Sequence, residues 1–237
     1  MSVSVVMTSF NRPVPLHHTL GSIARQRFPN LEVVVVDDGT DKDTEKVCHS
    51  FGATHIKVSR PHSEVCSTPA WPNNVGIRHA KGDIIVLQNA ECLHVDPKTI
   101  EKLTSGVSDR NVSFAHVTAL HADGSFYMVY CGKENPRPLF FCGAIQKRWF
   151  EKLRGFDEEF YHSGYDDNDF GDRLRHEGVT FEFSDVEVHH QWHPSSGRID
   201  IEPMRILYEK KLAAMNSGEI TAIRNFESWG EICKGTL

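Results

Sequence analysis

The order of apolar segments in the first 95 residues constrains the fold more than any other feature of the chain. Residues 31–36 form the run Leu-Glu-Val-Val-Val-Val, which is typical of a strand buried on both faces of a parallel sheet. The alternating segment 3–7 predicts a strand before this run, and 55–58 predicts one after it. Apolar residues at helical spacing occupy the two intervals between these strands, at 16–27 and 43–51. Strand, helix, strand, helix and strand with short connections predict a parallel sheet with crossover helices.

The pattern continues to about residue 95 and then changes. A predicted helix at 73–79 leads into a strand at 84–87, which completes a nucleotide-binding type of half-domain. After Asp96 and Pro97 the predicted elements are a helix, two strands, two helices, a strand and a helix, at 98–105, 112–117, 126–129, 146–153, 168–176, 180–188 and 202–215. We therefore expect an α/β fold in a single domain over 1–237, with a nucleotide-binding half at about 1–95, a second half at about 96–200, and a C-terminal helix and tail at 201–237.

Composition excludes several classes of protein. Hydrophobic residues make up 39% of the chain and charged residues 24%, which is enough apolar material for a core and excludes wholesale disorder. Lys and Arg number 26 against 32 Asp and Glu, a formal net charge of −6. This balance argues against a protein whose affinity comes mainly from phosphate-backbone contacts with nucleic acid.

The ends of the chain and its cysteines predict a cytoplasmic protein. Residues 1–7 contain neither a basic start nor the apolar core of ~7–15 residues that a signal peptide needs. The longest apolar runs, such as 33–36, have about four residues, whereas a membrane span needs ~20. The six cysteines include no C-x-x-C pair, so we expect reduced thiols and no zinc ribbon. We accordingly expect no integral membrane segment.

Polar and aromatic side chains follow the first two predicted strands. The first strand ends in Thr-Ser-Phe-Asn-Arg-Pro, which contains Thr8 and Phe10, and the second ends in Asp-Asp-Gly with Asp38. Ligands of open α/β sheets bind at the carboxyl ends of the strands, where a carboxylate can accept hydrogen bonds from a base or ribose and an aromatic ring can stack. The alternative is ordinary turn and helix-cap chemistry, and either segment alone leaves the two interpretations about equal.

The next strand end supplies a further acid. Residues 84–87 lead into Gln-Asn-Ala-Glu, which ends at Glu91. This carboxylate faces the same crevice as Asp38 if the sheet is parallel, and it could hold a divalent cation against a diphosphate. One such acid is weak evidence, but three strand ends converging on one crevice favour function.

The densest cluster of acids lies at the start of a predicted helix, in Tyr-Asp-Asp-Asn-Asp-Phe-Gly-Asp, and includes Asp166 and Asp167. Such residues can cap a helix and complement its dipole. Mutual repulsion also raises the pKa of a carboxyl group among like charges, which suits a general base. We favour the functional interpretation of this cluster.

Three histidines follow the last predicted strand, in His-His-Gln-Trp-His at 189–193. His190 and His193 lie three residues apart, and imidazole nitrogen together with a carboxylate oxygen suits Mn²⁺. A metal site and an ordinary structural role are about equally supported by this pattern alone.

With these motifs in view, the chain resembles the family 2 glycosyltransferases, which are inverting enzymes of the GT-A fold that use nucleotide sugars. The similarity runs over about four-fifths of the chain. Its pieces are an opening strand through Asn-Arg-Pro at 3–13, the Glu-Val-Val-Val-Val-Asp-Asp-Gly strand at 32–39, the segment 74–91 that leads to a metal-binding D-x-D, and Gly-Phe-Asp-Glu at 155–158 followed by Asp-Asp-Asn-Asp-Phe-Gly at 166–171. The resemblance implies a single GT-A domain with a mixed, mostly parallel sheet flanked by helices.

The resemblance also implies roles for individual residues. The residues expected to hold the donor are Thr8, Phe10, Arg12, Asp38, Asn74 and Asn89, with Asp38 contacting uracil or ribose. Glu91 matches the last acid of D-x-D, and His190 or His193 completes a Mn²⁺ or Mg²⁺ site with it. Asp167 matches the general base, with Asp166 beside it for the acceptor hydroxyl.

The function implied is transfer of a sugar, most simply from a UDP-sugar, to a hydroxyl on a glycan or another biopolymer. Two alternatives stay open: a transferase-like module that binds nucleotide or sugar without turnover, and a modified base in DNA as acceptor. A nucleotidyltransferase is less favoured, because the first strand is not followed by a glycine-rich phosphate loop. The sequence leaves the donor sugar, the acceptor and the oligomeric state open.

Overall fold

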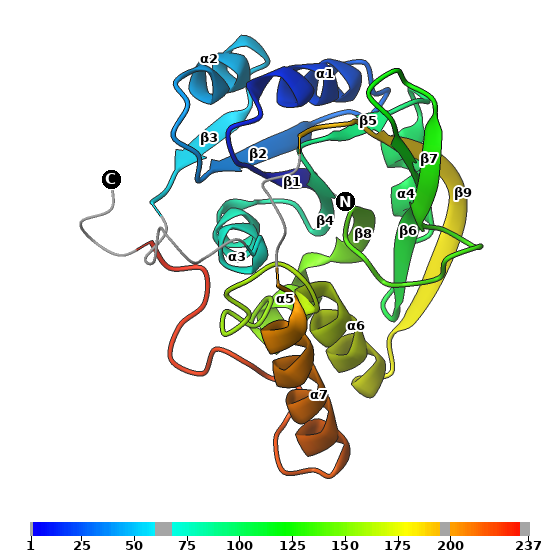
Figure 1. Cartoon of the computed structure of the whole chain (residues 1–237). Helices are drawn as coiled ribbons and strands as arrows, with labels where there is room; N and C mark the ends of the chain where they lie inside the picture. The colour runs from blue at the N-terminus through cyan, green and yellow to red at the C-terminus, as the bar shows by residue number, and fades with distance from the viewer. Residues whose placement is uncertain (1, 60–67, 195–199, 233–237) are drawn as a thin grey trace.

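The computed structural model describes residues 2–59, 68–194 and 200–232, and its centre is one nine-stranded sheet (Figure 1). The strand order is β3-β2-β1-β4-β8-β6-β9-β5, with β7 paired to β6 outside this path. The strands are β1 Val3–Ser9, β2 Leu31–Asp37, β3 Thr54–Lys57, β4 Ile84–Asn89, β5 Cys92–His94, β6 Asn111–Leu120, β7 Phe126–Cys131, β8 Cys142–Gln146 and β9 Thr180–His190. The helices are α1 Pro13–Ala24, α2 Asp43–Ser50, α3 Ala70–His79, α4 Thr99–Ser105, α5 Lys147–Leu153, α6 Asp166–His176 and α7 Glu202–Asn216.

The first half of the sheet is parallel, as the sequence predicts. β1 lies between β2 and β4 and runs parallel to both, and β3 extends the parallel set beyond β2. Figure 1 shows α1 and α2 on one face of these strands and α3 on the other. The core positions of β1 and β2 are therefore covered on both sides, which explains the unbroken valine run.

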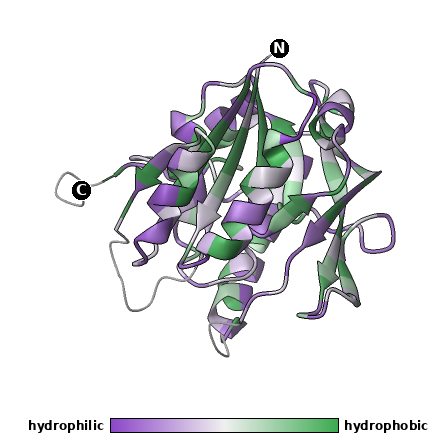
Figure 2. Ribbon diagram, turned by 90° about the horizontal axis from the view of Figure 1, so that it is seen from above, coloured by the Kyte–Doolittle hydropathy of each residue, from purple (hydrophilic) through white to green (hydrophobic). Residues whose placement is uncertain are grey.

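The second half makes the sheet mixed. β8 runs antiparallel to β4 and β6, β6 runs parallel to β9, and β5 pairs antiparallel with β9. The α/β fold class and its mixed sheet are thereby confirmed. Figure 2 shows apolar residues concentrated along the central strands, with hydrophilic residues more frequent on the outer helices.

Two strands were not predicted from the sequence. β5 has three residues, which is too short for an alternating pattern. β8 ends at Gln146, where the pattern predicts the start of a helix, and α5 begins at the following residue, Lys147. Similarly, α1 begins at Pro13 rather than at residue 16, because proline is well accommodated in the first helical turn.

An aromatic cluster fixes α6 against the sheet. Phe150 of α5 and Phe170 of α6 stack with ring centroids 4.9 Å apart, and Phe156 lies 4.7 Å from Phe170. Phe140, which precedes β8, packs edge-on against Phe114 of β6 at 5.0 Å. All five side chains are buried. Because this packing holds the helix in place, the acids in its first turn occupy defined positions.

The longest helix, α7, has 15 residues. Within the described ranges, no helix has both the length and the apolar character required to cross a membrane. The four described cysteines, Cys48, Cys92, Cys131 and Cys142, are buried free thiols, while Cys66 and Cys233 lie outside the described residues.

Candidate active site

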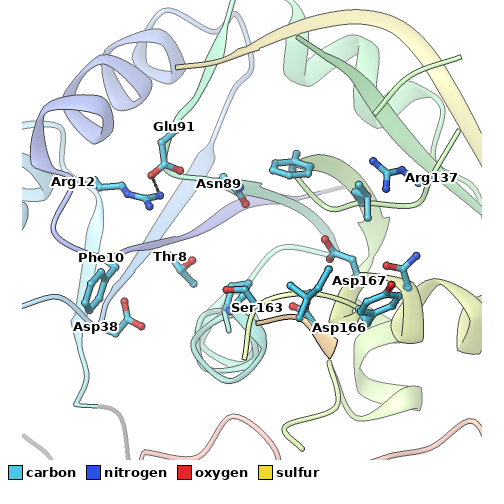
Figure 3. Close-up of a pocket in the computed structure, with 17 residues that line it drawn as sticks. Thr8, Phe10, Arg12, Asp38, Asn89, Glu91, Arg137, Ser163, Asp166 and Asp167 are labelled. Carbon is cyan, nitrogen blue, oxygen red and sulfur yellow. Dashed lines mark hydrogen bonds and ion pairs between the residues drawn. The ribbon is translucent and has the colours of Figure 1, made fainter. Parts of the chain in front are cut away.

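A cavity of about 600 Å³ opens at the carboxyl ends of β1, β2 and β4 and extends to the start of α6 (Figure 3). Most of the residues singled out from the sequence line it, together with residues from the loops before β8 and before α6. The lining comprises Thr8, Phe10, Arg12, Asp38, Pro69, Asn89, Glu91, Arg137, Leu139, Phe141, Ser163, Gly164, Tyr165, Asp166, Asp167, Asn168 and Ile201. A volume of this size is in the range of small-molecule and cofactor sites, ~300–1,000 Å³.

The loops after β1 and β2 are joined through Asn11. The Oδ1 atom of Asn11 accepts hydrogen bonds from the backbone N–H groups of Thr40 at 2.6 Å and Asp41 at 3.0 Å. A Cβ atom at Gly39 would lie 2.6 Å from the backbone nitrogen of Asn11, so this close approach requires glycine. The two loops therefore form one unit, and Figure 3 shows Phe10 and Asp38 side by side at the cavity wall.

The neighbouring carboxylates Asp37 and Asp38 have different surroundings. The Oδ2 atom of Asp37 lies 3.0 Å from Lys57 Nζ and 3.1 Å from His55 Nε2, and its Oδ1 atom accepts the Gly39 N–H at 2.9 Å. Asp37 thus stabilises the strand end, whereas Asp38 lines the cavity. Asp38 thus faces the crevice at the carboxyl ends of the strands, and its role in donor binding stays a prediction.

Glu91 lies on a different wall of the cavity from Phe10 and Asp38. Thr8 pairs with Asn89 in the β1–β4 register, and Glu91 follows two residues later, so the three side chains share one sheet edge. The Glu91 side chain is only 3% exposed and forms an ion pair with Nη1 of Arg12. A buried carboxylate needs such a partner, because an unpaired charge is costly in the interior.

Glu91, His190 and His193 form a set of three potential metal ligands. One ligand atom from each lies within 4.8 Å of the others. Their proximity follows from the antiparallel pairing of β5 with β9, in which Cys92 lies opposite His190. Burial lowers the pKa of His190 to about 4, although the charge of Glu91 opposes this shift. His190 is therefore neutral near pH 7 and carries a nitrogen lone pair that can bind a metal.

The four acids at the start of α6 lie in three different surroundings. Asp166 and Asp167 line the cavity, Asp169 forms a buried ion pair with Arg173 Nε at 2.7 Å, and Asp172 accepts a hydrogen bond from the Tyr208 hydroxyl at 2.6 Å. The packing of the cluster thus explains two of its acids without any ligand.

The two cavity acids have raised pKa values. Burial raises the pKa of Asp166 to about 6, against the opposing effect of hydrogen bonds to its carboxylate. Burial, followed by the negative charge of Asp166, raises the pKa of Asp167 well above its ordinary value. Each acid therefore binds a proton more tightly than an exposed aspartate does, which is a property of general bases.

Asn74 does not lie at the cavity, contrary to what the sequence predicts for a donor-binding residue. Its side chain is buried in α3, where Nδ2 donates to the Phe156 carbonyl at 2.9 Å and to Glu158 Oε1 at 2.8 Å. Its Oδ1 atom accepts the Phe156 N–H at 2.8 Å. Gly155 has φ +70°, and a Cβ there would lie 2.2 Å from Asn74 Oδ1. The Gly-Phe-Asp-Glu motif and Asn74 together join α3 to the segment before α6.

Sequence reasoning missed Arg137, Phe141 and Ser163. No periodic pattern marks them, because they lie in loops that reach the cavity only through tertiary packing. One indirect signal exists for Arg137: a Cβ on Gly171 of α6 would lie 2.6 Å from Pro138 Cγ. This glycine lets the loop that carries Arg137 pack against α6 and close one wall of the cavity.

Comparison with solved structures identifies the class of this fold. A TarS structure from S. aureus in complex with UDP-GlcNAc has a TM-score of 0.65 at 15% identity, over 90% of this chain and 66% of that one. The mannosyltransferase PcManGT from Pyrobaculum calidifontis, in complex with GDP-Man and Mn²⁺, has a TM-score of 0.59 at 18% identity, over 92% and 63%. The fold is therefore that of the GT-A glycosyltransferases.

The chain belongs to glycosyl transferase family 2, whose family model matches residues 4–158. A second model, described as the N-terminal domain of galactosyltransferase, matches residues 128–195. Hyaluronan synthase of Pasteurella multocida is 27% identical over 243 residues, which cover 82% of this chain and 25% of the synthase. The chain thus spans about a quarter of the length of this relative.

Proposed function

We propose that the chain is a metal-dependent, inverting glycosyltransferase domain that transfers a sugar from a UDP-sugar to a hydroxyl group of a glycan. The observation that carries this proposal is the arrangement of one cavity. Phe10 and Asp38 form one wall, Glu91 with its two histidines lies near a second, and Asp166 and Asp167 form a third. A donor, its metal ion and an acceptor could thus meet in one place.

Phe10 and Asp38 are proposed to hold the nucleoside. Phe10 lines the cavity and is 47% exposed, and an aromatic ring in this position can stack on a base. The Asp38 carboxylate can accept a hydrogen bond from the imide N–H of uracil or from a ribose hydroxyl. The TarS structure with UDP-GlcNAc supports a donor that contains uridine. PcManGT binds GDP-Man, so a guanosine donor is the alternative to test.

The residues present fit a divalent cation. One carboxylate oxygen and two imidazole nitrogens within 4.8 Å are a donor set suited to Mn²⁺, and burial keeps His190 neutral. A bound cation supplies a Lewis acid that offsets the charge on the departing diphosphate. Glu91, His190 and His193 would hold it.

Asp167 is proposed to act as the general base. In a single displacement its carboxylate takes the proton from the acceptor hydroxyl while that oxygen bonds to the anomeric carbon, and the bond to the diphosphate oxygen breaks on the opposite face. The product is therefore inverted at that carbon. Asp166, beside it, is proposed to orient the acceptor hydroxyl.

A glycan acceptor is supported by the relatives, which include a hyaluronan synthase and two chondroitin synthases. A nucleic-acid acceptor is less favoured because the cavity lining contains four acids, Asp38, Glu91, Asp166 and Asp167, against the two arginines Arg12 and Arg137.

The test is a nucleotide-release assay with UDP-, GDP-, TDP- and CDP-sugars, with Mn²⁺ or with EDTA. We expect release of UDP that needs Mn²⁺ and is lost in Glu91→Gln. The matched control is Glu45→Gln, an exposed glutamate on α2. Preferential release of GDP would overturn the uridine assignment. Thermal stabilisation by UDP without release from any donor or acceptor would instead indicate a binding module.

A further inference from the structure

We propose that Arg12 is a built-in competitor for the metal site: it neutralises Glu91 in the metal-free protein and transfers to the donor diphosphate when a cation binds. This inference rests on the proposed function and assigns Arg12 two successive partners. The sequence assigned Arg12 only to donor binding. The ion pair with Glu91 gives Arg12 a second partner, which is a residue of the proposed metal site.

The first observation is the burial of Glu91. Its side chain is 3% exposed, and among the described residues no other Lys or Arg forms an ion pair with it. A carboxylate buried to this degree is costly unless a cation or hydrogen-bond donors compensate its charge, and Arg12 supplies that cation here. Arg12 and a divalent metal are therefore alternative partners of one carboxylate.

The second observation is that the backbone on both sides of the ion pair is held in place. Asn11 is anchored to the β2–α2 loop through Oδ1, Pro13 begins α1, and the Arg12 carbonyl accepts the Leu16 N–H at 3.1 Å. The Glu91 carbonyl accepts hydrogen bonds from Gln191. An exchange of partners at Glu91 therefore needs rotation of the Arg12 side chain alone.

The third observation is the direction available to that side chain. The Arg12 side chain is 28% exposed and lines the cavity, so its guanidinium is already at the edge of the space proposed for the donor. Figure 3 shows it reaching Glu91 across the rim of the cavity, opposite Asp166 and Asp167. A cation at Glu91 would repel the guanidinium. The diphosphate of a donor bound in the cavity would then be a suitable partner, because the planar guanidinium can donate two hydrogen bonds to phosphate oxygens.

The proposal predicts effects of opposite sign in one variant. Arg12→Gln should bind Mn²⁺ ~10-fold more tightly than the wild type, because the metal no longer displaces a charge-assisted hydrogen bond. At saturating Mn²⁺ the same variant should bind UDP ~10-fold more weakly, because the diphosphate has lost its arginine. Isothermal titration calorimetry measures both. If Arg12 merely stabilised the loop, its substitution would weaken the binding of both Mn²⁺ and UDP.

Arg27→Gln is the matched control. Arg27 is exposed and follows the C-terminal end of α1, whereas Arg12 precedes its N-terminal end. This control makes the same change of charge and should leave both affinities at the wild-type values.

The outcomes separate the two proposals. Wild-type protein that binds no Mn²⁺ would overturn the metal site and this inference together. If the wild type binds Mn²⁺, Glu91→Gln loses this binding and Arg12→Gln keeps the wild-type affinity, the metal site stands and only the competition by Arg12 is overturned. A crystal structure of the wild-type protein with Mn²⁺ and UDP needs no variant: the proposal requires that Arg12 has left Glu91 for the diphosphate, and an intact Arg12–Glu91 pair beside the metal would contradict it.

Discussion

The backbone carbonyl of Glu91 accepts two hydrogen bonds from Gln191, one from its N–H at 3.0 Å and one from Nε2 at 3.2 Å. The same Nε2 atom lies 3.1 Å from the Pro15 carbonyl and 3.1 Å from Thr19 Oγ1. Gln191 therefore joins the loop before β5, the end of β9 and the start of α1. These bonds of the Gln191 side chain and backbone N–H fix the backbone that carries Glu91 next to that of His190.

The first prediction concerns Gln191. Gln191→Leu keeps all three metal ligands and the backbone N–H bond to the Glu91 carbonyl but removes the side-chain hydrogen bonds of Nε2, so we expect a 10- to 100-fold loss of Mn²⁺ affinity, roughly the effect of removing a supporting partner of a ligand. Calorimetric titration with Mn²⁺ measures this. Gln146→Leu makes the same substitution at the end of β8 and should leave the affinity unchanged. Equal affinities in the two variants would contradict the positioning role of Gln191.

The second prediction concerns turnover and pH. Asp167→Asn should reduce the rate of sugar transfer by ~10²–10⁴-fold, the usual contribution of a general base. Because burial and Asp166 raise the pKa of Asp167, wild-type activity should fall as pH decreases through a midpoint above the ordinary range for aspartate. Rate–pH profiles test both statements. Asp172→Asn, on the same helix but paired with Arg175, is the control and should keep the wild-type profile. A wild-type rate in Asp167→Asn would exclude this residue as the base.

The third prediction concerns stability at the same residue. The folded pKa of Asp167 is raised, so between its unfolded and folded pKa values the folded state holds a proton that the unfolded state has released. Stability supplied by this group therefore falls as pH rises through that window. Asp167→Asn removes the effect and should be more stable than the wild type at about pH 8, with the difference disappearing at about pH 4. Urea unfolding of both proteins at the two pH values measures the difference. A variant less stable than the wild type at the higher pH would contradict the raised pKa.

The part of the site that depends on neighbouring parallel strands could be predicted from the sequence. Val3–Ser9, Leu31–Asp37 and Ile84–Asn89 each carry a clear apolar pattern, and strands that run parallel bring their ends to one edge. Thr8 and Asp38 follow from that rule, and both line the cavity. The structure also brings together Glu91, His190 and His193, although β5, whose pairing explains their proximity, is too short to predict.

The rest depends on contacts that no local pattern records. An asparagine that precedes a strand by ten residues can serve a ligand or a buried network equally well, and only the packing of residues 155–158 against α3 assigns Asn74 to the network. Likewise, four acids near one helix start look alike in sequence, yet Arg173 and Tyr208 pair with two of them from the same helix and from α7. Burial and partner identity, which decide these cases, are properties of the tertiary structure.

The fourth prediction separates structural from ligand-binding roles at Asn74. Asn74→Ala removes three hydrogen bonds, two buried and one partly buried, and should lower the free energy of unfolding by about 2–4 kcal/mol. Its effect on the KM for the donor should be small at temperatures where the variant is folded. Asn216→Ala, at the exposed end of α7, is the control and should change neither quantity. Full stability with weakened donor binding would restore the assignment made from the sequence.

The fifth prediction concerns the stacking surface. Phe10 is 47% exposed, so Phe10→Ala should change the free energy of unfolding by no more than about 0.5 kcal/mol. Stacking of a base on an aromatic ring contributes ~1–3 kcal/mol, so the same variant should bind UDP about 5- to 150-fold more weakly at saturating Mn²⁺. Phe226→Ala removes a 69% exposed ring that does not line the cavity and should bind UDP as the wild type does. Calorimetry with UDP and with Mn²⁺ alone distinguishes a lost stacking contact from a damaged metal site, because Phe10→Ala must retain its Mn²⁺ affinity. Loss of both affinities would show that Phe10 supports the β1–α1 loop instead of contacting the base.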